Sequence, residues 1–291
     1  MNVLVTGGSG FIGSHVVDKL LDKGHQVRVL DVQTSHLKNV DYINGSILDL
    51  DAVKKAISEI DVIYHFAGVS NIDKVKGNPL ETIEYNILGT ANLIEQARIQ
   101  KINRFLFASS VYVFDGGGHL YTYSKRVSED LCKYYHELYD LPFSILRLAT
   151  AYGPRSRGED VISIYVRNSM EGRPILVKGS GNQIRNFIYV KELADGCVKA
   201  LSERCKNNII TLAGKEQINI RELSLLVKKL FDDRVRIKIQ PENNRDSDYL
   251  GVIENIDESY EMLDWKPAID LETGIKKYID WCKLFSKFAY N

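Results

Sequence analysis

The stretch Thr6-Gly7-Gly8-Ser9-Gly10-Phe11-Ile12-Gly13 decides the fold of this chain. It follows a short apolar run at residues 2–6, which predicts a β-strand, and it opens an amphipathic pattern at residues 11–23, which predicts a helix. Three of its glycines recur every third residue. In a strand–loop–helix context, the first allows a tight turn, the second lets backbone approach a pyrophosphate, and the third lets helix and strand pack closely. The start of the helix then faces the phosphates with unpaired N–H groups, so the stretch predicts a dinucleotide-binding loop.

An acidic residue closes the next predicted strand. Asp31 ends the run at residues 26–31, 18 residues after Gly13. A carboxylate at this position binds the adenosine ribose hydroxyls and repels the 2′-phosphate of NADP. Val32 and Gln33 follow it, and neither is basic. The sequence therefore predicts NAD as the cofactor.

The first half of the chain alternates short β-branched runs with helical patterns. This alternation predicts an α/β fold with a Rossmann-type doubly wound parallel sheet. Strands are expected at residues 2–6, 26–31, 62–66, 104–109 and 143–148, and helices at 11–23, 51–59, 80–100 and 121–139.

The second half is less regular and predicts a smaller, mixed α/β domain that binds substrate. Its turn signal, Tyr152-Gly153-Pro154, places a boundary near Ala149. We expect the cofactor domain to cover residues 1–149 and about 187–212, and the substrate domain about 150–186 and 213–291. Helices are expected at residues 159–170, 190–201, 220–231 and 271–283, and strands at 209–212 and 235–239.

Composition and charge exclude several classes of protein. Lys and Arg together number 38, as do Asp and Glu, so the formal net charge is zero. A nucleic-acid or membrane-surface protein would rest on a basic field, and none is present. The sequence contains neither a signal peptide pattern nor an apolar run long enough for a membrane span. The four cysteines have neither metal-site nor disulfide-framework spacing, so we expect a reduced, cytoplasmic protein without a metal.

A tyrosine and a lysine lie one helical turn apart. Tyr121 and Lys125 occupy positions i and i+4 of a predicted helix and therefore share one face. A free tyrosine titrates near ~10 and is a poor base at neutral pH. A nearby ammonium and an oxidised nicotinamide would both favour the phenolate. The pair thus predicts a proton acceptor for a sugar or alcohol hydroxyl.

These motifs occur in an order that resembles the extended short-chain dehydrogenase/reductase family. Within it, the chain is similar to the NAD-dependent nucleotide-sugar epimerases and dehydratases, which include UDP-glucose 4-epimerase. The resemblance covers residues 2–267, almost the whole chain. Its motifs are Thr6–Gly13, His65–Gly68, Asn86–Thr90, Phe107–Ser110, Tyr121–Lys125, Ala151–Arg155, Gly179–Val190, Arg245–Asp248 and Leu263–Pro267.

The resemblance implies a role for individual residues. Tyr121 is the base, Lys125 holds the ribose and tunes Tyr121, and Ser110 bonds the reacting sugar oxygen. Two arginines clamp a nucleotide diphosphate, as suits a dianionic group. The cofactor set is Gly7, Gly10, Phe11, Ile12, Gly13, Asp31, Ser46, Ile47, Phe66, Ala67, Gly68, Asn86, Tyr121 and Lys125. The substrate set is Ser110, Thr150, Arg185, Arg245, Asp248 and Val252.

Three positions depart from the family pattern. Ser110 and Tyr121 are only 11 residues apart, a shorter spacing than the family usually has, and a short glycine loop joins them. Ser46 stands where the family usually has an acid near the adenine, which leaves Ile47 and the backbone to contact it. Thr150 stands where the family commonly has an asparagine.

The residues that follow Ser110 argue against some of the reactions of this family. Dehydratases and decarboxylases of this group carry an acid there, whereas this chain has Val111 and Tyr112. Ketoreductases usually prefer NADP, which Asp31 disfavours. The sequence thus favours C4 epimerisation of a UDP-hexose or UDP-N-acetylhexosamine, with Val252 where such epimerases gate the C2 substituent. A nucleotide-keto-sugar reductase or sugar dehydrogenase, and a non-catalytic cofactor-binding relative, remain alternatives.

The resemblance also implies an oligomer. The predicted helices at residues 80–100 and 121–139 carry apolar stripes beyond those that pack on the sheet. In this family such helices form a four-helix interface, so we expect a homodimer.

Overall fold

A computed structural model describes residues 1–34, 37–70, 72–114, 119–232, 234–241, 253 and 256–286. The chain forms two compact units. The first comprises residues 1–148, 194–212 and 253–266, and the second comprises residues 149–193, 213–252 and 267–291.

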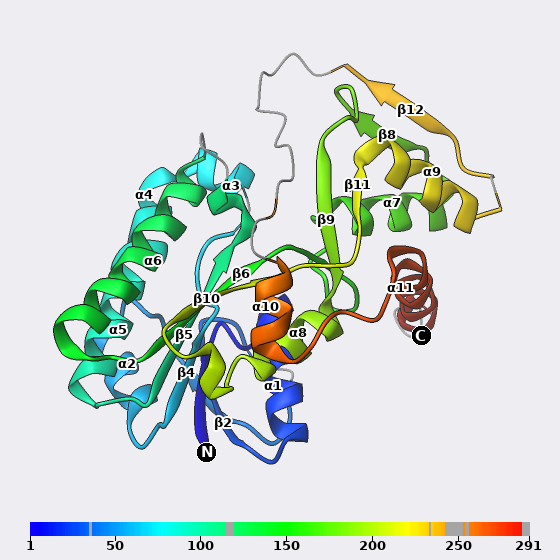
Figure 1. Cartoon of the computed structure of the whole chain (residues 1–291). Helices are drawn as coiled ribbons and strands as arrows, with labels where there is room; N and C mark the ends of the chain where they lie inside the picture. Colours follow the sequence, from blue (N-terminus) through cyan, green and yellow to red (C-terminus); the bar gives the residue numbers. More distant parts are fainter. Residues whose placement is uncertain are drawn as a thin grey trace. The chain divides into compact units, whose positions relative to one another are not determined.

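The first unit is built on one parallel sheet of seven strands (Figure 1). Its order is β10-β6-β5-β4-β1-β2-β3, and each neighbouring pair is parallel. The chain order reverses between β1 and β4, where a doubly wound sheet binds its ligand at the carboxyl ends of the strands. The strands are β1 (Asn2–Thr6), β2 (Gln26–Asp31), β3 (Asp41–Asn44), β4 (Val62–His65), β5 (Arg104–Ser110), β6 (Phe143–Leu148) and β10 (Asn208–Leu212).

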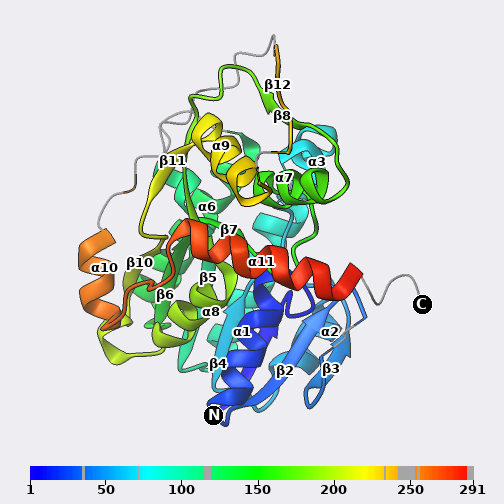
Figure 2. The same cartoon turned by 90° about the vertical axis from the view of Figure 1, so that its right-hand side faces the viewer.

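Helices cover both faces of this sheet, so the predicted Rossmann-type fold is confirmed. On one face α2 (Leu50–Ile57), α5 (Gly89–Ile99) and α6 (Leu120–Tyr139) pack side by side, with α3 (Ile72–Gly77) and α4 (Pro79–Ile83) beyond them (Figure 1). Figure 2 shows α1 (Phe11–Asp22), which contacts β1 and β2, on the other face. That face also carries α10 (Ile256–Leu263) and the end of α8 (Val190–Lys199).

The helix expected at residues 80–100 is interrupted. It consists of α4, a π-helical turn at Glu84–Leu88, and α5. The main-chain oxygen of Asn86 accepts hydrogen bonds from the hydroxyls of Thr90, at 2.7 Å, and Ser128, at 2.8 Å. These hydroxyls satisfy a carbonyl that the irregular turn would otherwise leave with a poor partner. The prediction of one continuous helix did not allow for this turn, whose extra residue rotates α4 by about 100° relative to α5.

The second unit has two small sheets. One is β11 (Gln217–Asn219), β9 (Ile184–Tyr189) and β7 (Thr150–Tyr152), with an antiparallel and a parallel pair, and the other pairs β12 (Ile237–Gln240) with β8 (Ile175–Lys178). The helices α7 (Val161–Met170), α9 (Ile220–Leu230) and α11 (Leu271–Ser286) bury apolar side chains in one core with these strands. The predicted smaller mixed domain is therefore present.

Several expectations differ from the structure in detail. The sequence analysis missed β3 and most short strands of the second unit, and it ended some helices a few residues late. The second segment of the first unit begins at residue 194 rather than about 187, and residues 253–266 belong to the first unit rather than the second. The reason is α10, whose buried Ser259 hydroxyl accepts the Thr211 N–H of β10 at 2.9 Å.

No helix among the described residues has the length and apolarity needed to cross a membrane.

The close packing of α1 on the glycine loop is testable. A Cβ atom at Gly13 would lie 2.2 Å from the Gly7 carbonyl oxygen, so Gly13→Ala must displace the backbone. We expect a loss of about 1–3 kcal/mol in the free energy of unfolding, measured with denaturant. Gly77→Ala is the control, since nothing lies within 4 Å of a Cβ there. Equal stability of the two variants would contradict this packing.

Candidate active site

The glycine loop places the start of α1 against the ends of β1 and β4. Gly7 has φ of +71°, and a Cβ atom on it would lie 2.6 Å from the Ala67 nitrogen. The Gly10 N–H donates to the Gly7 oxygen at 3.1 Å, which closes the turn, and Gly10 is the N-cap of α1. Phe11 and Ile12 then form the first turn of the helix. The backbone therefore passes as close to its neighbours as a dinucleotide loop requires.

Asp31 lies beside this loop, as the sequence predicts for a ribose-binding carboxylate. One of its oxygens accepts the Ser9 N–H at 2.9 Å, and the other accepts the Gln33 N–H at 2.9 Å. The Ser9 hydroxyl oxygen is buried and has no hydrogen-bond partner among the described residues. Buried polar groups are normally satisfied, so an orphaned hydroxyl in a glycine loop is what a bound dinucleotide would complete. The loop and Asp31 thus fit NAD.

Three further predicted cofactor residues, Ser46, Ile47 and Gly68, differ in how exposed they are. Gly68 is exposed beyond β4, with φ of +149°, and the neighbouring Phe66 ring stacks on Tyr64. The Ser46 hydroxyl accepts the Leu48 N–H at 3.1 Å and shapes the turn before α2. The side chain of Ile47 is buried in the core instead. Any adenine contact from Ile47 must therefore come through its backbone.

The three predicted catalytic residues lie together between β5 and α6. Ser110 ends β5, and its hydroxyl is hydrogen-bonded to Tyr121 on the first turn of α6. The Lys125 Nζ donates to the Ala108 oxygen at 2.7 Å and lies 5.8 Å from the centre of the Tyr121 ring. All three residues are at most 9% exposed. The short spacing between Ser110 and Tyr121 has therefore not separated them.

Burial sets the protonation states of this group. It raises the pKa of Tyr121 to about 12, against the lowering effect of the Ser110 hydrogen bond. It lowers the pKa of Lys125 to about 8, while the nearby charge of Glu129 raises it. At neutral pH the protein alone thus holds Tyr121 as a phenol and Lys125 largely as an ammonium.

A buried histidine links the glycine loop to the helices, a role that the sequence analysis missed. A hydroxyl lies on each side of the ring: Thr6 Oγ1 is 2.7 Å from His65 Nδ1, and Thr90 Oγ1 is 2.9 Å from His65 Nε2. Since Thr90 gives its one hydroxyl proton to the Asn86 oxygen, His65 Nε2 must donate to Thr90. Burial lowers the pKa of His65 to about 3, so the ring stays neutral.

Asn86 holds backbone in place rather than pointing at a ligand. Its side-chain oxygen accepts the Val69 N–H at 2.7 Å, and its two N–H groups serve the Val69 oxygen and the Ser124 hydroxyl. The Ser124 hydroxyl in turn donates to the main-chain oxygen of Tyr121 at 2.7 Å. Asn86 therefore ties the segment after β4 to the turn of α6 that carries Tyr121.

A buried ion pair, which the sequence analysis also missed, lies one turn beyond Lys125. Glu129 accepts two hydrogen bonds from Arg147 of β6, at 2.9 and 2.7 Å, and one from the Ser109 hydroxyl at 2.6 Å. The side chain of Glu129 is 3% exposed and that of Arg147 is 19% exposed. The signal in the sequence is the spacing of Tyr121, Lys125 and Glu129, which puts three polar side chains on one helix face at i, i+4 and i+8.

Besides Ser110, two of the predicted substrate residues lie among the described residues, and both belong to the second unit. Thr150 begins β7, and Arg185 lies on β9, where its Nη1 donates to the Ile184 oxygen at 2.9 Å. Arg245, Asp248 and Val252 lie outside the described residues.

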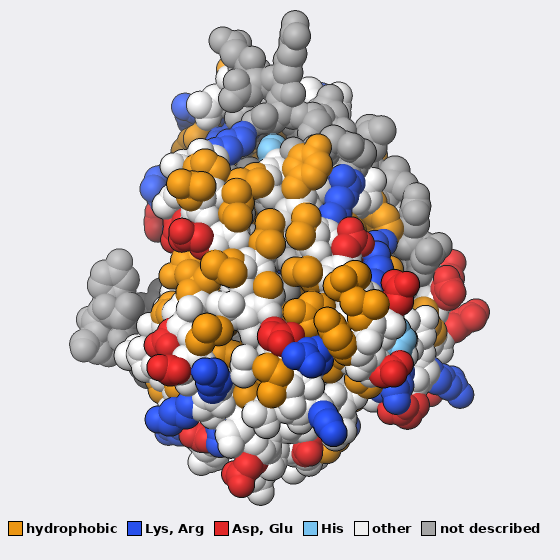
Figure 3. Space-filling model, turned by 90° about the vertical axis from the view of Figure 1, so that its left-hand side faces the viewer, with side chains coloured by type: hydrophobic (Ala, Val, Ile, Leu, Met, Phe, Trp, Pro, Cys, Tyr) orange, Lys and Arg blue, Asp and Glu red, His pale blue; other side chains and the backbone are white. Residues whose placement is uncertain are grey.

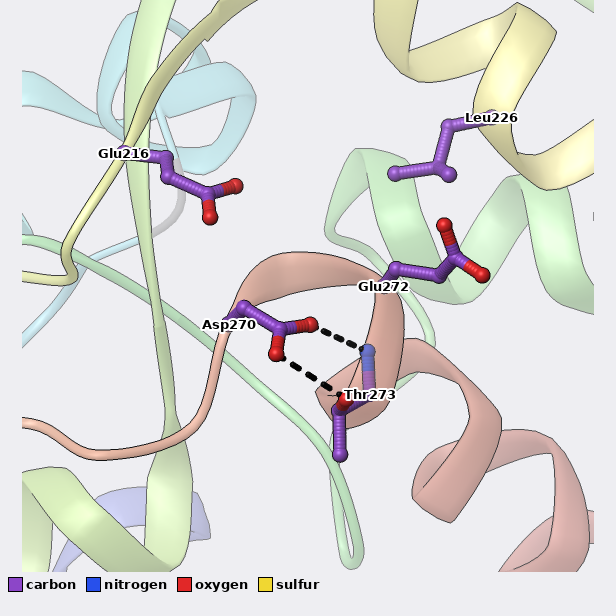
Figure 4. Close-up of a pocket in the computed structure, with 5 residues that line it drawn as sticks. All are labelled: Glu216, Leu226, Asp270, Glu272 and Thr273. Atoms are coloured by element: carbon purple, nitrogen blue, oxygen red, sulfur yellow. Dashed lines mark hydrogen bonds between the residues drawn. The ribbon is translucent and has the colours of Figure 1, made fainter.

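A pocket of the second unit is lined by Glu216, Leu226, Asp270, Glu272 and Thr273 (Figure 4). Two of its carboxylates have structural partners. Asp270 accepts the N–H and hydroxyl of Thr273 at the start of α11, and Glu272 pairs with Lys276 at 2.6 Å. These contacts lower the pKa of both acids, so neither is poised as a proton donor. The described residues also contain no group of three His, Cys, Asp or Glu that could hold a metal ion.

Comparisons with known proteins show the family of this chain. Residues 3–214 match the model of the NAD dependent epimerase/dehydratase family. A Methanocaldococcus jannaschii protein named "Putative UDP-glucose 4-epimerase" is 33% identical, over 97% of this chain and 98% of its own. The UDP-glucuronic acid decarboxylase 1 of Danio rerio is 30% identical, over 96% of this chain and 72% of its own.

Solved structures extend the likeness to the fold. The UDP-glucuronic acid 4-epimerase of Bacillus cereus, in complex with UDP-glucuronic acid and NAD, has a TM-score of 0.89 and 25% identity, covering 98% of this chain and 100% of its own. The expected cofactor, NAD, is thus confirmed at the level of the family. The glycine loop, the carboxylate that ends β2 and the Ser110–Tyr121–Lys125 group of this chain are consistent with these matches. This chain therefore belongs to the NAD-dependent epimerase/dehydratase family of extended short-chain dehydrogenases/reductases.

Proposed function

We propose that this protein is an NAD-dependent 4-epimerase of a nucleotide-diphosphate sugar, with a UDP-hexose or UDP-N-acetylhexosamine as substrate. One observation carries the proposal. Ser110, Tyr121 and Lys125 form a buried group suited to moving the proton of a sugar hydroxyl, and no carboxylic acid occupies the two positions after Ser110.

The missing acid separates epimerisation from the reactions of other relatives. Val111 and Tyr112 follow Ser110, and the Tyr112 ring lies edge-on to the Tyr121 ring at 6.5 Å. Neither side chain can perform carboxyl acid–base chemistry at neutral pH. Glu129, the buried acid of α6, is held by three hydrogen bonds from Arg147 and Ser109 and is engaged with them rather than with the Ser110 hydroxyl. This favours C4 epimerisation over the decarboxylation named for the Danio rerio relative.

The residues act on one oxygen of the sugar. Tyr121 removes the proton of the 4-hydroxyl and later returns it, while Ser110 holds the same oxygen by a hydrogen bond. NAD held by the glycine loop and Asp31 would supply a hydride acceptor and donor for C4, and its positive charge would favour the phenolate of Tyr121. Lys125 adds its own charge to that effect. Rotation of the 4-keto sugar between the two transfers exposes its opposite face, so the hydride returns with inverted configuration.

The nucleotide part of the substrate falls to residues outside this group. We propose that Arg185 and Arg245 bind the diphosphate, because guanidinium groups match its paired oxygens. Asp248 is proposed to contact the nucleoside, Thr150 the sugar, and Val252 to admit a group at C2. UDP is the nucleotide named for the epimerase relatives.

We also propose that the protein is a homodimer. Large apolar side chains are exposed along α6 at Tyr123, Val127, Tyr134 and Leu138, spaced so that they form one stripe. Figure 3 shows the face that carries α4, α5 and α6, where apolar side chains gather between charged ones. An exposed apolar surface of this kind is typical of a protein interface. A second copy would cover it and pair α5 and α6 with their counterparts.

The epimerase proposal predicts tightly held cofactor and no net oxidation. Denatured protein should release about one equivalent of NAD, identified by chromatography. Incubation with UDP-glucose or UDP-N-acetylglucosamine should yield the 4-epimer, detected by proton NMR, without added cofactor. Net consumption of NAD(P)H with a keto-sugar would instead identify a reductase, and loss of carbon dioxide from UDP-glucuronic acid would identify a decarboxylase.

Tyr121→Phe should keep the cofactor and lose turnover. The variant removes only the hydroxyl, so NAD content should match the parent, while kcat should fall at least about a hundredfold, as for loss of a proton-transfer group. Tyr123→Phe, an exposed tyrosine on the same helix, is the matched control and should keep kcat. Unchanged turnover in Tyr121→Phe would remove that residue from the mechanism.

The homodimer should dissociate when charge enters the stripe. The parent should have twice the chain mass by light scattering, and Leu138→Glu should shift it to the monomer. Leu225→Glu places the same charge at an equally exposed leucine of α9, in the second unit, and should leave the dimer intact. A monomeric parent protein would refute the proposal.

A further inference from the structure

The buried face of α6 carries a third charged residue beside the proposed catalytic pair. Tyr121, Lys125 and Glu129 occupy successive turns, and each contacts the end of β5. Tyr121 meets Ser110, Lys125 Nζ bonds the Ala108 oxygen, and Glu129 bonds the Ser109 hydroxyl. Three consecutive residues of one strand are thus attached to three consecutive turns of one helix.

Glu129 also reaches the neighbouring strand. Ser109 and Arg147 are paired across β5 and β6, and Glu129 accepts hydrogen bonds from both of them. The Arg147 guanidinium carbon in turn lies 4.8 Å from the centre of the Phe114 ring, at the end of the short helical turn Val111–Phe114. One carboxylate therefore joins the helix to two strands.

Among the described residues, few charged or titratable groups lie near the buried Lys125 side chain. The groups that face it are Tyr121, Glu129 and Cys132 on its own helix and His65 on β4, with Arg147 beyond Glu129. Burial keeps the His65 ring neutral, raises the pKa of Tyr121 to about 12, and raises that of the Cys132 thiol still further. Glu129, one helical turn from Lys125, is the carboxylate whose charge raises the pKa of Lys125 against the effect of burial.

We propose that Glu129 is a positioning residue of the catalytic group: it keeps Lys125 charged and holds the Ser109–Ser110 end of β5 against Tyr121, with Arg147 as its counterion. This role rests on the proposed use of Tyr121 and Lys125 in catalysis. A purely structural ion pair would affect stability alone.

The charge effect can be measured without any substrate. In protein labelled with carbon-13 at lysine Cε, the resonance of Lys125 is identified by its loss in Lys125→Met. Glu129→Gln keeps the size of the side chain but removes its charge. The titration midpoint of Lys125 should then fall by about one pH unit or more, because the carboxylate that opposes the effect of its burial is gone. An unchanged midpoint would overturn the proposal.

The chain offers a matched control. Glu95 of α5 also accepts two hydrogen bonds from one arginine, Arg98, which stacks 4.8 Å from the Tyr139 ring. Its pair is partly exposed, so Glu95→Gln removes the same kind of bond without touching Lys125. This variant should leave the Lys125 midpoint and kcat unchanged.

Kinetics provide the second readout. In Glu129→Gln, kcat at pH 7 should fall at least about tenfold with KM nearly unchanged, and its alkaline limb should move to lower pH. A lowered melting temperature with the parent's pH profile would show a structural pair only. If the parent epimerises no UDP-sugar, the proposed function fails, while the lysine titration still tests Glu129.

Removal of one partner from a buried pair can prevent folding. The double variant, Glu129→Gln with Arg147→Gln, removes the carboxylate together with its counterion, and it should also lower the Lys125 midpoint, by less than the single variant because the like charge of Arg147 is gone too. If neither variant folds, Glu129 is a requirement of the fold, and the proposal is rejected.

Discussion

The cost of burying one charge shapes the first unit near the ends of β5 and β6. That charge belongs to Lys125, which is 7% exposed. An isolated ammonium in a low-dielectric interior either loses its proton or destabilises the fold. Here the charge is retained by one backbone oxygen of β5 and by one carboxylate a helical turn away. That carboxylate needs its own counterion, which β6 provides through Arg147. The same constraint therefore joins α6, β5 and β6, and it does so where the proposed chemistry takes place.

The polar groups around this site are satisfied in a single consistent pattern. The hydroxyl protons of Thr90 and Ser124 are committed to main-chain oxygens, so each of these side chains can only accept from its other neighbour. This leaves His65 as a neutral ring with its proton on Nε2, and Thr6 as the donor to Nδ1. A buried network in which every donor has one partner is rigid and costly to rearrange. It connects the strand before the glycine loop with the helix of Tyr121 through side chains that carry no charge.

Much of the first unit could be predicted from sequence because its signals are local. The glycine loop, Asp31 and the Tyr121–Lys125 pair each lie within one strand, turn or helix, and β1, β2 and β6 have the predicted bounds. The buried hydrogen bonds could not be predicted in the same way. Glu129 pairs with Arg147 across 18 residues of chain, and Tyr64 bonds the Cys197 oxygen across 133, so neither pair leaves a periodic trace. The short strands of the second unit are similarly determined by their partners more than by their own composition.

The π-helical turn at Glu84–Leu88 also determines how α4 and α5 face their surroundings. One residue occupies about 100° of an α-helix, so a helix without this extra residue would turn every side chain of α4 by that angle relative to α5. Leu80 and Ile83, which are now exposed, would leave the surface that continues the stripe of α6, and the Asn78 cap would point elsewhere. The length of this segment thus determines which side chains of α4 are exposed. A relative with one residue fewer here would keep the same elements in the same order, yet it would offer a different outer surface.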